Sequence, residues 1–152
     1  MINKAHSRGI KICLNPAPFG PEVLAYPLEQ VDVLVLNETE AQGLVGREAP
    51  DELLDAVGAR FPGAEVIITA GARGALYCSP VTRLQVPAAE ATAVDTTAAG
   101  DTFIGYYLAG AAAGQDRESC LRRAARAAAL CVTRPGAMDS IPATLEVEEW
   151  RE

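Results

Sequence analysis

Residues 93–108 read AVDTTAAGDTFIGYYL, and we expect the rest of the chain to be organised around this stretch. The small residues Ala98, Ala99 and Gly100 precede an apolar helical run, which places Asp101 in the first turn of a helix. Small side chains let a ligand approach the backbone, and the unpaired N–H groups and dipole of a helix start attract an anion. The stretch therefore predicts an anion-binding turn beside a carboxylate that is placed to act as a base. From chemistry alone it is equally consistent with an ordinary strand-to-helix turn, whose aspartate complements the dipole.

Length and composition indicate a globular protein that binds neither nucleic acid nor membranes. A chain of 152 residues, 49% hydrophobic and 22% charged, fits a single domain over residues 1–152 with a real core. Its net charge of −7 is unlike that of a nucleic-acid binder, and the cluster of Arg122, Arg123 and Arg126 is expected on a solvated helix face. The longest apolar run, 103–114, is shorter than the roughly 20 residues of a membrane span.

The N-terminal residues and the cysteines indicate a cytoplasmic protein. Charged and polar residues interrupt the first segment, so no signal peptide is expected there. The four cysteines lie far apart without a CxxC pair, which favours buried free thiols in a reducing compartment. The one histidine, His6, lies near a terminus, and no GxxxxGK[ST] or GxGxxG motif is present. Catalysis would therefore depend on carboxylates, backbone donors and bound ions.

Helical and strand patterns alternate along the chain, as an α/β fold requires. The apolar runs at 31–36 and 64–69 are typical of strands covered on both faces, and 10–14 is expected to be a shorter strand. A β-prone lead-in at 93–94 precedes the anion turn, and 75–79 and 82–86 indicate a hairpin. Helices are expected over 22–26, 37–45, 50–61, 103–114 and 117–133, with a long loop at 133–142 and a short charged helix around Trp150. In the helix at 117–133, residues 121, 125, 128 and 132 are expected to share one face.

Asn37 and Glu40 support two compatible interpretations. Their spacing predicts a capping box, in which Asn37 caps the helix and Glu40 reaches back to it. The same residues follow a strand, at the edge of an open α/β sheet where ligands bind, and Glu40 is a candidate to hold water on Mg²⁺. Spacing alone favours the capping interpretation.

Two further segments carry both a structural and a functional interpretation. The glycine turn 70–74 follows a strand, so it is either a tight connection or a turn whose backbone contacts a nucleotide phosphate or ribose. The loop 133–142 is either a surface connection or a source of carbonyls and the Ser140 hydroxyl for a cation.

Several motifs together resemble the ribokinase family of sugar and nucleoside kinases, also called the phosphofructokinase B (PfkB) family. The segment VDTTAAGDTFIG at 94–105 is similar to the C-terminal signature of that family. Four other segments, in the family's order and spacing, are LNPAP at 14–18, LNETEA at 36–41, ITAGARGA at 68–75 and AAALCVTRPGAMDSIP at 127–142. The resemblance is strongest to ribokinases. It implies a three-layer α/β/α fold with a mostly parallel central sheet.

The resemblance also implies a role for each matching residue. Asp101 would be the base for a sugar hydroxymethyl group that attacks the γ-phosphate of ATP. The family's anion hole matches the N–H groups of Ala98, Ala99, Gly100 and Asp101, and its magnesium element matches Asn37 and Glu40. Its nucleotide contacts match Thr69, Gly71, Gly74 and Ala125. Its potassium site matches Asp95, Thr97, Gly136 and Ser140. The implied cofactors are ATP, Mg²⁺ and K⁺, and the implied acceptor is a small sugar such as ribose.

The chain resembles only the C-terminal half of that family. The N-terminal sugar-binding and lid part has no counterpart in it, and an exposed sheet edge would invite a homo-oligomer or a complementary N-terminal half. Two other hypotheses therefore stand beside a sugar kinase. One is an inactive nucleotide-binding remnant or one half of a split kinase, and the other is a structural or interaction module.

Overall fold

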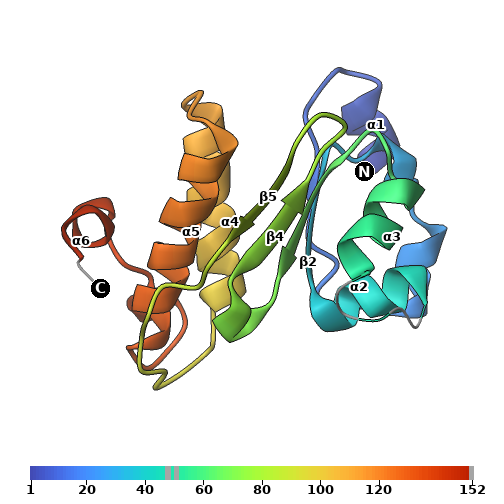
Figure 1. Cartoon of the computed structure of the whole chain (residues 1–152). Coiled ribbons are helices and arrows are strands. Elements are labelled where there is room, and N and C mark those ends of the chain that lie inside the picture. Colours follow the sequence, from blue (N-terminus) through green and yellow to red (C-terminus); the bar gives the residue numbers. More distant parts are fainter. Residues whose placement is uncertain (47–48, 50–51, 151–152) are drawn as a thin grey trace. The chain divides into compact units, whose positions relative to one another are not determined.

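The computed structural model describes residues 1–46, 49 and 52–150, and its contacts divide the chain into two compact units. The first, which we call the sheet unit, contains Met1–Ala70 and Leu76–Gln85. The second, which we call the helical unit, contains Gly71–Ala75 and Val86–Glu152. Figure 1 labels elements of both units. The expectation of a single domain stays a prediction, and each unit is described by itself.

The sheet unit contains most of a five-stranded sheet with the order β1-β2-β3-β4-β5. Three strands, β1 (Cys13–Leu14), β2 (Val33–Asn37) and β3 (Glu65–Thr69), run parallel, and Asn37 pairs with Thr69 at their carboxyl ends. The next two, β4 (Ala75–Cys78) and β5 (Arg83–Val86), are neighbours joined by four residues, which is a hairpin and therefore antiparallel. The sheet is mostly parallel on its β1 side, and the expected hairpin is confirmed.

The core of the sheet unit lies between the parallel strands and two helices, α2 (Glu38–Val45) and α3 (Leu53–Arg60). Consecutive positions in β2 and β3 are buried, as is typical of strands covered on both faces. Alternate strand residues pack with helix residues in one cluster that includes Leu34, Leu36, Val66, Ile68, Leu44, Leu53, Leu54 and Val57. Short helices α1 (Ile2–His6), η1 (Pro21–Ala25) and η2 (Leu28–Gln30) complete this unit.

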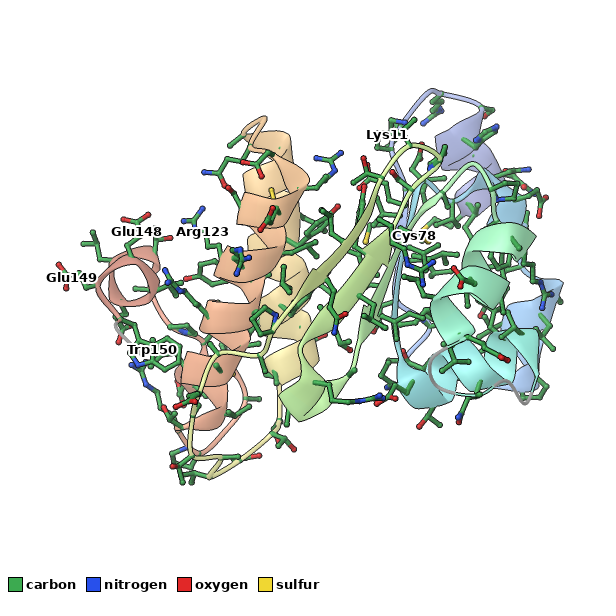
Figure 2. The ribbon with its side chains drawn as sticks, in the orientation of Figure 1. Lys11, Cys78, Arg123, Glu148, Glu149 and Trp150 are labelled. Atoms are coloured by element: carbon green, nitrogen blue, oxygen red, sulfur yellow. The ribbon has the colours of Figure 1, made fainter. Side chains whose placement is uncertain are left out.

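The helical unit is built on two packed helices, α4 (Ala99–Ala112) and α5 (Arg117–Val132). Asp116 caps α5 by accepting the Ser119 N–H, which is why the chain turns at 114–116 as expected. The helix α6 (Thr144–Glu149) follows the short helix η4 (Met138–Ser140), and an ion pair joins Glu148 to Arg123 on α5 (Figure 2). The short helix η3 (Gly71–Arg73) belongs to this unit as well.

Several expected elements are shorter than the sequence pattern indicated. The strand expected at 10–14 is only β1, because the Ile12 N–H donates to the Asp32 carboxylate (2.9 Å) while Lys11 forms an ion pair with the same group. The helix expected at 22–26 is a 3₁₀ helix with proline at its start. Of the helix expected at 50–61, the structure gives α3, whereas Pro50 and Asp51 lie outside the described residues.

In two details the helical unit differs from the expectations drawn from the sequence. The lead-in at 93–94 is not a strand, since the Val94 N–H donates instead to the carbonyl of Val132 at the end of α5 (2.7 Å), and the Val94 side chain is exposed. The buried face of α5 contains Cys120, Leu121, Ala124, Ala127 and Cys131, so Ala125, Ala128 and Val132 are only half-buried. Packing against α4, rather than apolar character alone, selected this face, because alanine and cysteine are small enough for close helix contact.

The cysteines and the helices bear on two other expectations. Cys120 and Cys131 are buried free thiols, whereas the free thiols Cys13 and Cys78 are half-buried. Among the helices of the described residues, none has the length and apolar character needed to cross a membrane.

Gly74 provides a test of the backbone in the glycine turn. It has a φ of +89°, and a Cβ at this position would lie 2.0 Å from the Val86 carbonyl oxygen. We expect Gly74→Ala to lower the free energy of unfolding by more than about 1 kcal/mol. Urea denaturation measures this change. Gly105→Ala is the control, because a Cβ there contacts nothing and alanine favours the helix interior by up to about 1 kcal/mol. A Gly74→Ala protein as stable as wild type would show that position 74 does not require glycine.

Candidate functional site

The start of α4 has the geometry of an anion-binding turn. Ala98 adopts a left-handed conformation (φ 63°), no side chain caps the helix, and the Thr102 N–H makes the first helical bond, to the Ala98 carbonyl (2.8 Å). The Ala99 N–H has a long contact with the Thr96 carbonyl (3.3 Å). Within the described residues, the N–H groups of Gly100 and Asp101 donate to no protein acceptor. Two unsatisfied donors and the positive end of a 14-residue helix therefore lie together.

Asp101 lies in the first turn of α4, as the sequence predicted, and its side chain is exposed. The next residue, Thr102, is buried and turned into the unit. The exposed carboxylate belongs to the same residue as one of the two open N–H groups, so it has access to whatever anion these groups bind. This arrangement suits proton acceptance beside a bound phosphate.

Asp95 joins the anion turn to the loop after α5. Its Oδ1 accepts the Thr97 N–H (2.9 Å), and its Oδ2 accepts the Gly136 N–H (3.0 Å), 41 residues away. A hydrogen bond from the Thr97 side chain and, after it, the two bonds from the N–H groups of Thr97 and Gly136 lower the pKa of Asp95 to about 2. The carboxylate is therefore ionised at neutral pH and fixed at both oxygens.

The four residues matched to a monovalent cation site gather in the helical unit. Asp95 contacts Thr97 and Gly136 directly, and the carbonyl of Thr97 and the hydroxyl of Ser140 both face the Sγ of Cys131 (3.7 and 3.2 Å). Their donor atoms are carboxylate, hydroxyl and carbonyl oxygens, the hard ligands that fit a cation such as K⁺. The structure thus brings together residues that the sequence separates by more than 30 positions.

The capping box at Asn37 and Glu40 is confirmed in the sheet unit. Asn37 Oδ1 accepts the Glu40 N–H (2.8 Å), and Glu40 Oε2 accepts the Asn37 N–H (2.9 Å). The side chain of Asn15, which directly follows β1, donates to the same Oε2 (3.2 Å) and to the Val35 carbonyl (2.8 Å). Glu40 is only 5% exposed, so its carboxylate is a buried, hydrogen-bonded group at the carboxyl ends of β1 and β2.

This arrangement fits a water-mediated magnesium ligand better than a direct one. One carboxylate oxygen of Glu40 already accepts two hydrogen bonds. Among the described residues there is no group of three or more His, Cys, Asp or Glu side chains that could hold a metal ion. Mg²⁺ retains several waters in most protein sites, so a single carboxylate is sufficient for indirect binding.

The residues matched to nucleotide contacts are distributed over both units. The Thr69 hydroxyl, at the end of β3, donates to the Leu36 carbonyl (3.3 Å) in the sheet unit. Gly71 and Gly74, in the helical unit, both have positive φ and close a turn through the Gly74 N–H and the Gly71 carbonyl (3.0 Å). Ala125 is half-buried in the middle of α5, in the helical unit.

Sequence reasoning missed three residues that organise these groups: Asn15, Thr102 and Cys131. Asn15 carried a usable signal, because it directly follows a strand, while Asn37 and Thr69 end theirs, and ligands bind at the carboxyl ends of parallel strands. Thr102 and Cys131 carried none, because only the packing of α4 on α5 brings them within 3.4 Å (Oγ1 to Sγ).

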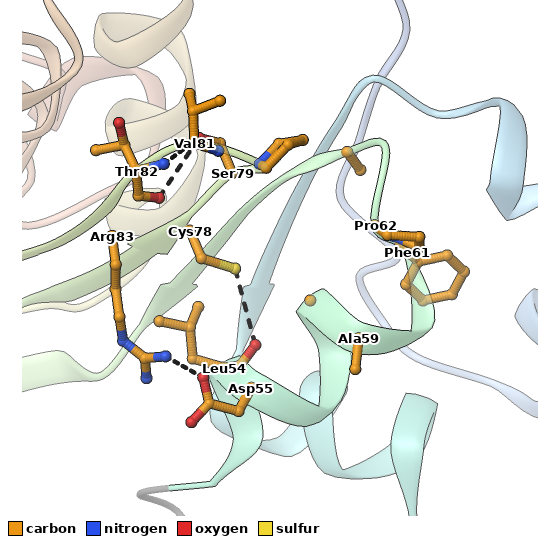
Figure 3. A pocket seen from close by; sticks show the side chains of 13 residues that line it. Leu54, Asp55, Ala59, Phe61, Pro62, Cys78, Ser79, Val81, Thr82 and Arg83 are labelled. Atoms are coloured by element: carbon orange, nitrogen blue, oxygen red, sulfur yellow. Dashed lines mark hydrogen bonds and ion pairs between the residues drawn. The ribbon is translucent and has the colours of Figure 1, made fainter.

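A separate hollow lies in the sheet unit, between α3 and the β4–β5 hairpin (Figure 3). It is an open cavity of about 460 Å³, and Asp55, Cys78 and Arg83 are among the polar residues that line it. Asp55 and Arg83 form an ion pair across it, and Cys78 Sγ faces the Leu54 carbonyl (3.8 Å). None of the predicted site residues lines this cavity.

Comparison with known proteins identifies the family. The family described as pfkB family carbohydrate kinase matches residues 1–144, and the chain belongs to this family. Ribokinase from Schizosaccharomyces pombe is 38% identical over 154 residues, which cover 95% of this chain and 48% of that protein. The chain thus spans about half the length of the curated relatives it matches.

Solved structures agree with the family and fold. Arabidopsis thaliana ribokinase complexed with ribose and ATP has a TM-score of 0.80 and 29% identity over 99% of this chain and 51% of that one. A ribokinase II from E. coli, in complex with ATP and Mg²⁺, has a TM-score of 0.83 and 30% identity over 97% of this chain and 50% of that one. The ribokinase-like α/β fold expected from the sequence is therefore confirmed.

Asn15 allows a test of the Glu40 network. Replacing it by alanine removes donors to the Val35 carbonyl and to Glu40 Oε2, and we expect Asn15→Ala to lower the free energy of unfolding by about 1–2 kcal/mol. Urea denaturation measures the change. Asn3→Ala, at an exposed position in α1, is the control and should leave stability within about 0.5 kcal/mol. Equal stabilities for the two variants would show that Asn15 does not support Glu40.

Asp95 predicts a specific dependence of stability on pH. The pKa falls from 3.8 to about 2 on folding, so the stabilisation is fully present above about pH 5 and is lost as the pH falls through 3.8 toward 2. We therefore expect Asp95→Asn to be less stable than wild type at pH 6, with a difference that shrinks at pH 2.5. Urea midpoints at both pH values measure this. Asp139→Asn, at an exposed position, is the control. A difference in stability that does not depend on pH would show that the lowered pKa of Asp95 does not stabilise the fold.

Proposed function

We propose that this chain is the nucleotide-binding and phosphoryl-transfer part of a sugar kinase, which transfers the γ-phosphate of MgATP to the hydroxymethyl group of a small sugar such as ribose. The observation that carries this proposal is the start of α4, where the N–H groups of Gly100 and Asp101 are open beside an exposed carboxylate. Membership of the family and the ATP and ribose bound in the Arabidopsis thaliana structure support it.

In this proposal Asp101 is the base for the sugar hydroxyl. A positioned carboxylate accepts the hydroxyl proton as the oxygen attacks phosphorus, and in a loose transition state this transfer comes late. Because Asp101 is exposed, its carboxylate is free to contact a substrate. The same helix turn therefore supplies both the proton acceptor and the electrostatic stabilisation of the phosphoryl group.

The anion hole is proposed to consist of the N–H groups of Ala98, Ala99, Gly100 and Asp101. Charge accumulates on the equatorial oxygens of the transferring phosphoryl group, and fixed N–H dipoles stabilise it without reorganising. Gly100 and Asp101 are ready for this role, whereas the Ala99 N–H must leave its long contact with Thr96 to join them.

The buried network of the sheet unit is proposed to place magnesium. Mg²⁺, when bound, neutralises charge on the phosphate oxygens. Glu40 would hold a water of its hydration shell, and Asn37 and Asn15 fix the direction of the Glu40 carboxylate through the bonds to Oε2. Thr69, Gly71, Gly74 and Ala125 are proposed to contact the nucleotide.

A monovalent cation is proposed to bind among Asp95, Thr97, Gly136 and Ser140. The ionised Asp95 carboxylate already links the anion turn to the loop after α5, and hard oxygen donors surround that link. K⁺ would add a positive charge beneath the anion turn and would favour phosphate binding there.

A second candidate function follows from the share of the relatives that the chain covers. Because the chain spans about half of those proteins, it is proposed to bind nucleotide while sugar contacts come from another polypeptide segment or from a second copy. Binding of ATP without turnover would favour this alternative. A chain that binds no ATP would instead act as a structural or interaction module.

Asp101→Asn tests the proposed reaction on the full chain. With MgATP and ribose we expect the variant to form ADP at least about 100-fold more slowly than wild type, because it cannot accept the proton. A coupled assay measures ADP, and calorimetry measures ATP affinity, which should stay within about threefold because the N–H groups remain.

Asp55→Asn is the matched control, since Asp55 is an exposed aspartate that pairs with Arg83 in the sheet unit. It should retain wild-type ADP production. Equal rates for wild type and Asp101→Asn would rule out Asp101 as the base, and ATP binding without any wild-type turnover would favour the second candidate.

A further inference from the structure

Cys131 lies at the junction between the anion turn and the loop after α5. Its side chain is fully buried in the last turn of α5. Three groups from different segments face its sulfur: the Thr102 hydroxyl (3.4 Å), the Ser140 hydroxyl (3.2 Å) and the Thr97 carbonyl (3.7 Å). Thr102 and Ser140 are themselves buried. A small apolar residue would fill this space but would leave these polar atoms without their shared partner.

The available protons determine the direction of the hydrogen bonds. Ser140 has one hydroxyl proton, which it donates to the Ala137 carbonyl at 2.7 Å. In the contact between Cys131 and Ser140 the thiol must therefore be the donor. The Thr102 hydroxyl donates to the sulfur, and the Thr97 carbonyl is the more distant of two acceptors near the single thiol proton. The result is a directed chain from Thr102 through Cys131 and Ser140 to Ala137.

This chain connects the segments that the proposed phosphate and cation sites use. Thr102 follows Asp101 directly and makes the first helical bond of α4, to Ala98. Ala137, one residue beyond Gly136, directly precedes η4, and Ser140 is the last residue of η4. The next residue along α5, Val132, accepts the N–H groups of Val94 and Asp95 (2.7 and 3.1 Å). The end of α5 thus contacts the chain before the anion turn, at Val94 and Asp95, and the helix after it, at Thr102.

We propose that Cys131 is a positioning residue, whose thiol passes a hydrogen bond between the first turn of α4 and the 137–140 loop and so holds the anion turn in its phosphate-binding shape. The inference rests on the proposed function, because the ligand of the turn is taken to be the phosphate of a nucleotide. It assigns a role to a cysteine that makes no contact with that ligand.

Hydrogen exchange on the full chain tests this role without any ligand. The informative amides are Thr102, Gly136 and Ser140, which donate to Ala98, Asp95 and Ala137, and the reference amide is Cys120, which donates to Asp116 within α5. In Cys131→Ala we expect the three amides to exchange about threefold faster relative to the reference, because the thiol bridge is lost. Cys131→Ser keeps a donor and an acceptor and should restore the wild-type ratio.

A matched control comes from the second buried cysteine of α5. The reference amide of Cys120 remains in Cys120→Ala, whose deleted sulfur faces only the Gln115 carbonyl (3.7 Å) among the hydrogen bonds of the described residues. We expect this variant to lose stability without changing the ratio. Faster exchange in both alanine variants, or equal acceleration in Cys131→Ala and Cys131→Ser, would mean that helix packing rather than the thiol hydrogen bonds holds the turn, and would overturn the inference.

Nucleotide affinity provides the functional readout. Calorimetry with MgADP should give a Kd about threefold weaker for Cys131→Ala than for wild type, with Cys131→Ser and Cys120→Ala near the wild-type value. An unchanged Kd in Cys131→Ala would overturn the link between the thiol and the phosphate site. If the wild-type chain binds no MgADP, the proposed function fails, while the exchange ratios still decide whether Cys131 positions the turn.

Discussion

The hydrogen bonds of the Asp95 carboxylate are the interactions on which the proposed site depends most. It accepts the N–H groups of Thr97 and Gly136, and so joins the entry to α4 with the loop after α5. The backbone next to it is held as well, because Val94 and Asp95 both donate to the Val132 carbonyl. With its path fixed in this way, the chain can enter α4 through a left-handed Ala98 and leave the first N–H groups of the helix open. An ordinary N-cap side chain would have satisfied those groups and removed the anion-binding character.

The two units use helix starts in opposite ways. At α2 the capping box satisfies the N–H groups of Asn37 and Glu40, and Asn15 adds a donor to the Glu40 carboxylate that is part of that box. At α4 no side chain caps the helix, and the carboxylate in its first turn, Asp101, is exposed. Where side chains accept hydrogen bonds from the N–H groups at a helix start, those groups are already stabilised. Where these N–H groups are open, binding an anion lowers the free energy. This contrast explains why the capping and magnesium interpretations of Asn37 and Glu40 are compatible: the cap fixes the carboxylate that the proposed magnesium site uses.

Buried polar contacts in the helical unit depend on close helix packing. The buried face of α5 consists mainly of alanine and cysteine, which lets α4 approach closely enough for Thr102 to reach the sulfur of Cys131. Larger residues would separate the helices and would disconnect the anion turn from the loop that contains Ser140. The helix pair therefore supports the proposed phosphate site indirectly, through the position of its two ends.

Much of this protein could be predicted from its sequence, because the relevant forces act locally. The apolar runs at 31–36 and 64–69 lie within two residues of β2 and β3, and the spacing of Asn37 and Glu40 specified the capping box. The small residues before Phe103 placed Asp101 correctly in the first turn of α4, although the expected helix at 103–114 began four residues too late. Hydrophobic periodicity and helix capping involve residues a few positions apart, so their signals are present in the chain itself. The motifs also indicated the family to which the chain belongs.

Only the tertiary structure decided which distant groups meet. The Asp95–Gly136 link, the Asn15–Glu40 contact and the hydrogen bonds of Cys131 join residues 41, 25 and up to 34 positions apart, and no local pattern encodes such pairs. The face of α5 that the sequence grouped together, residues 121, 125, 128 and 132, differs from the buried face for the same reason, since a run of alanines is nearly uniform in polarity and only the partner helix selects a side. The sequence by itself determined the elements and the anion turn, whereas packing determined the contacts that hold this turn open.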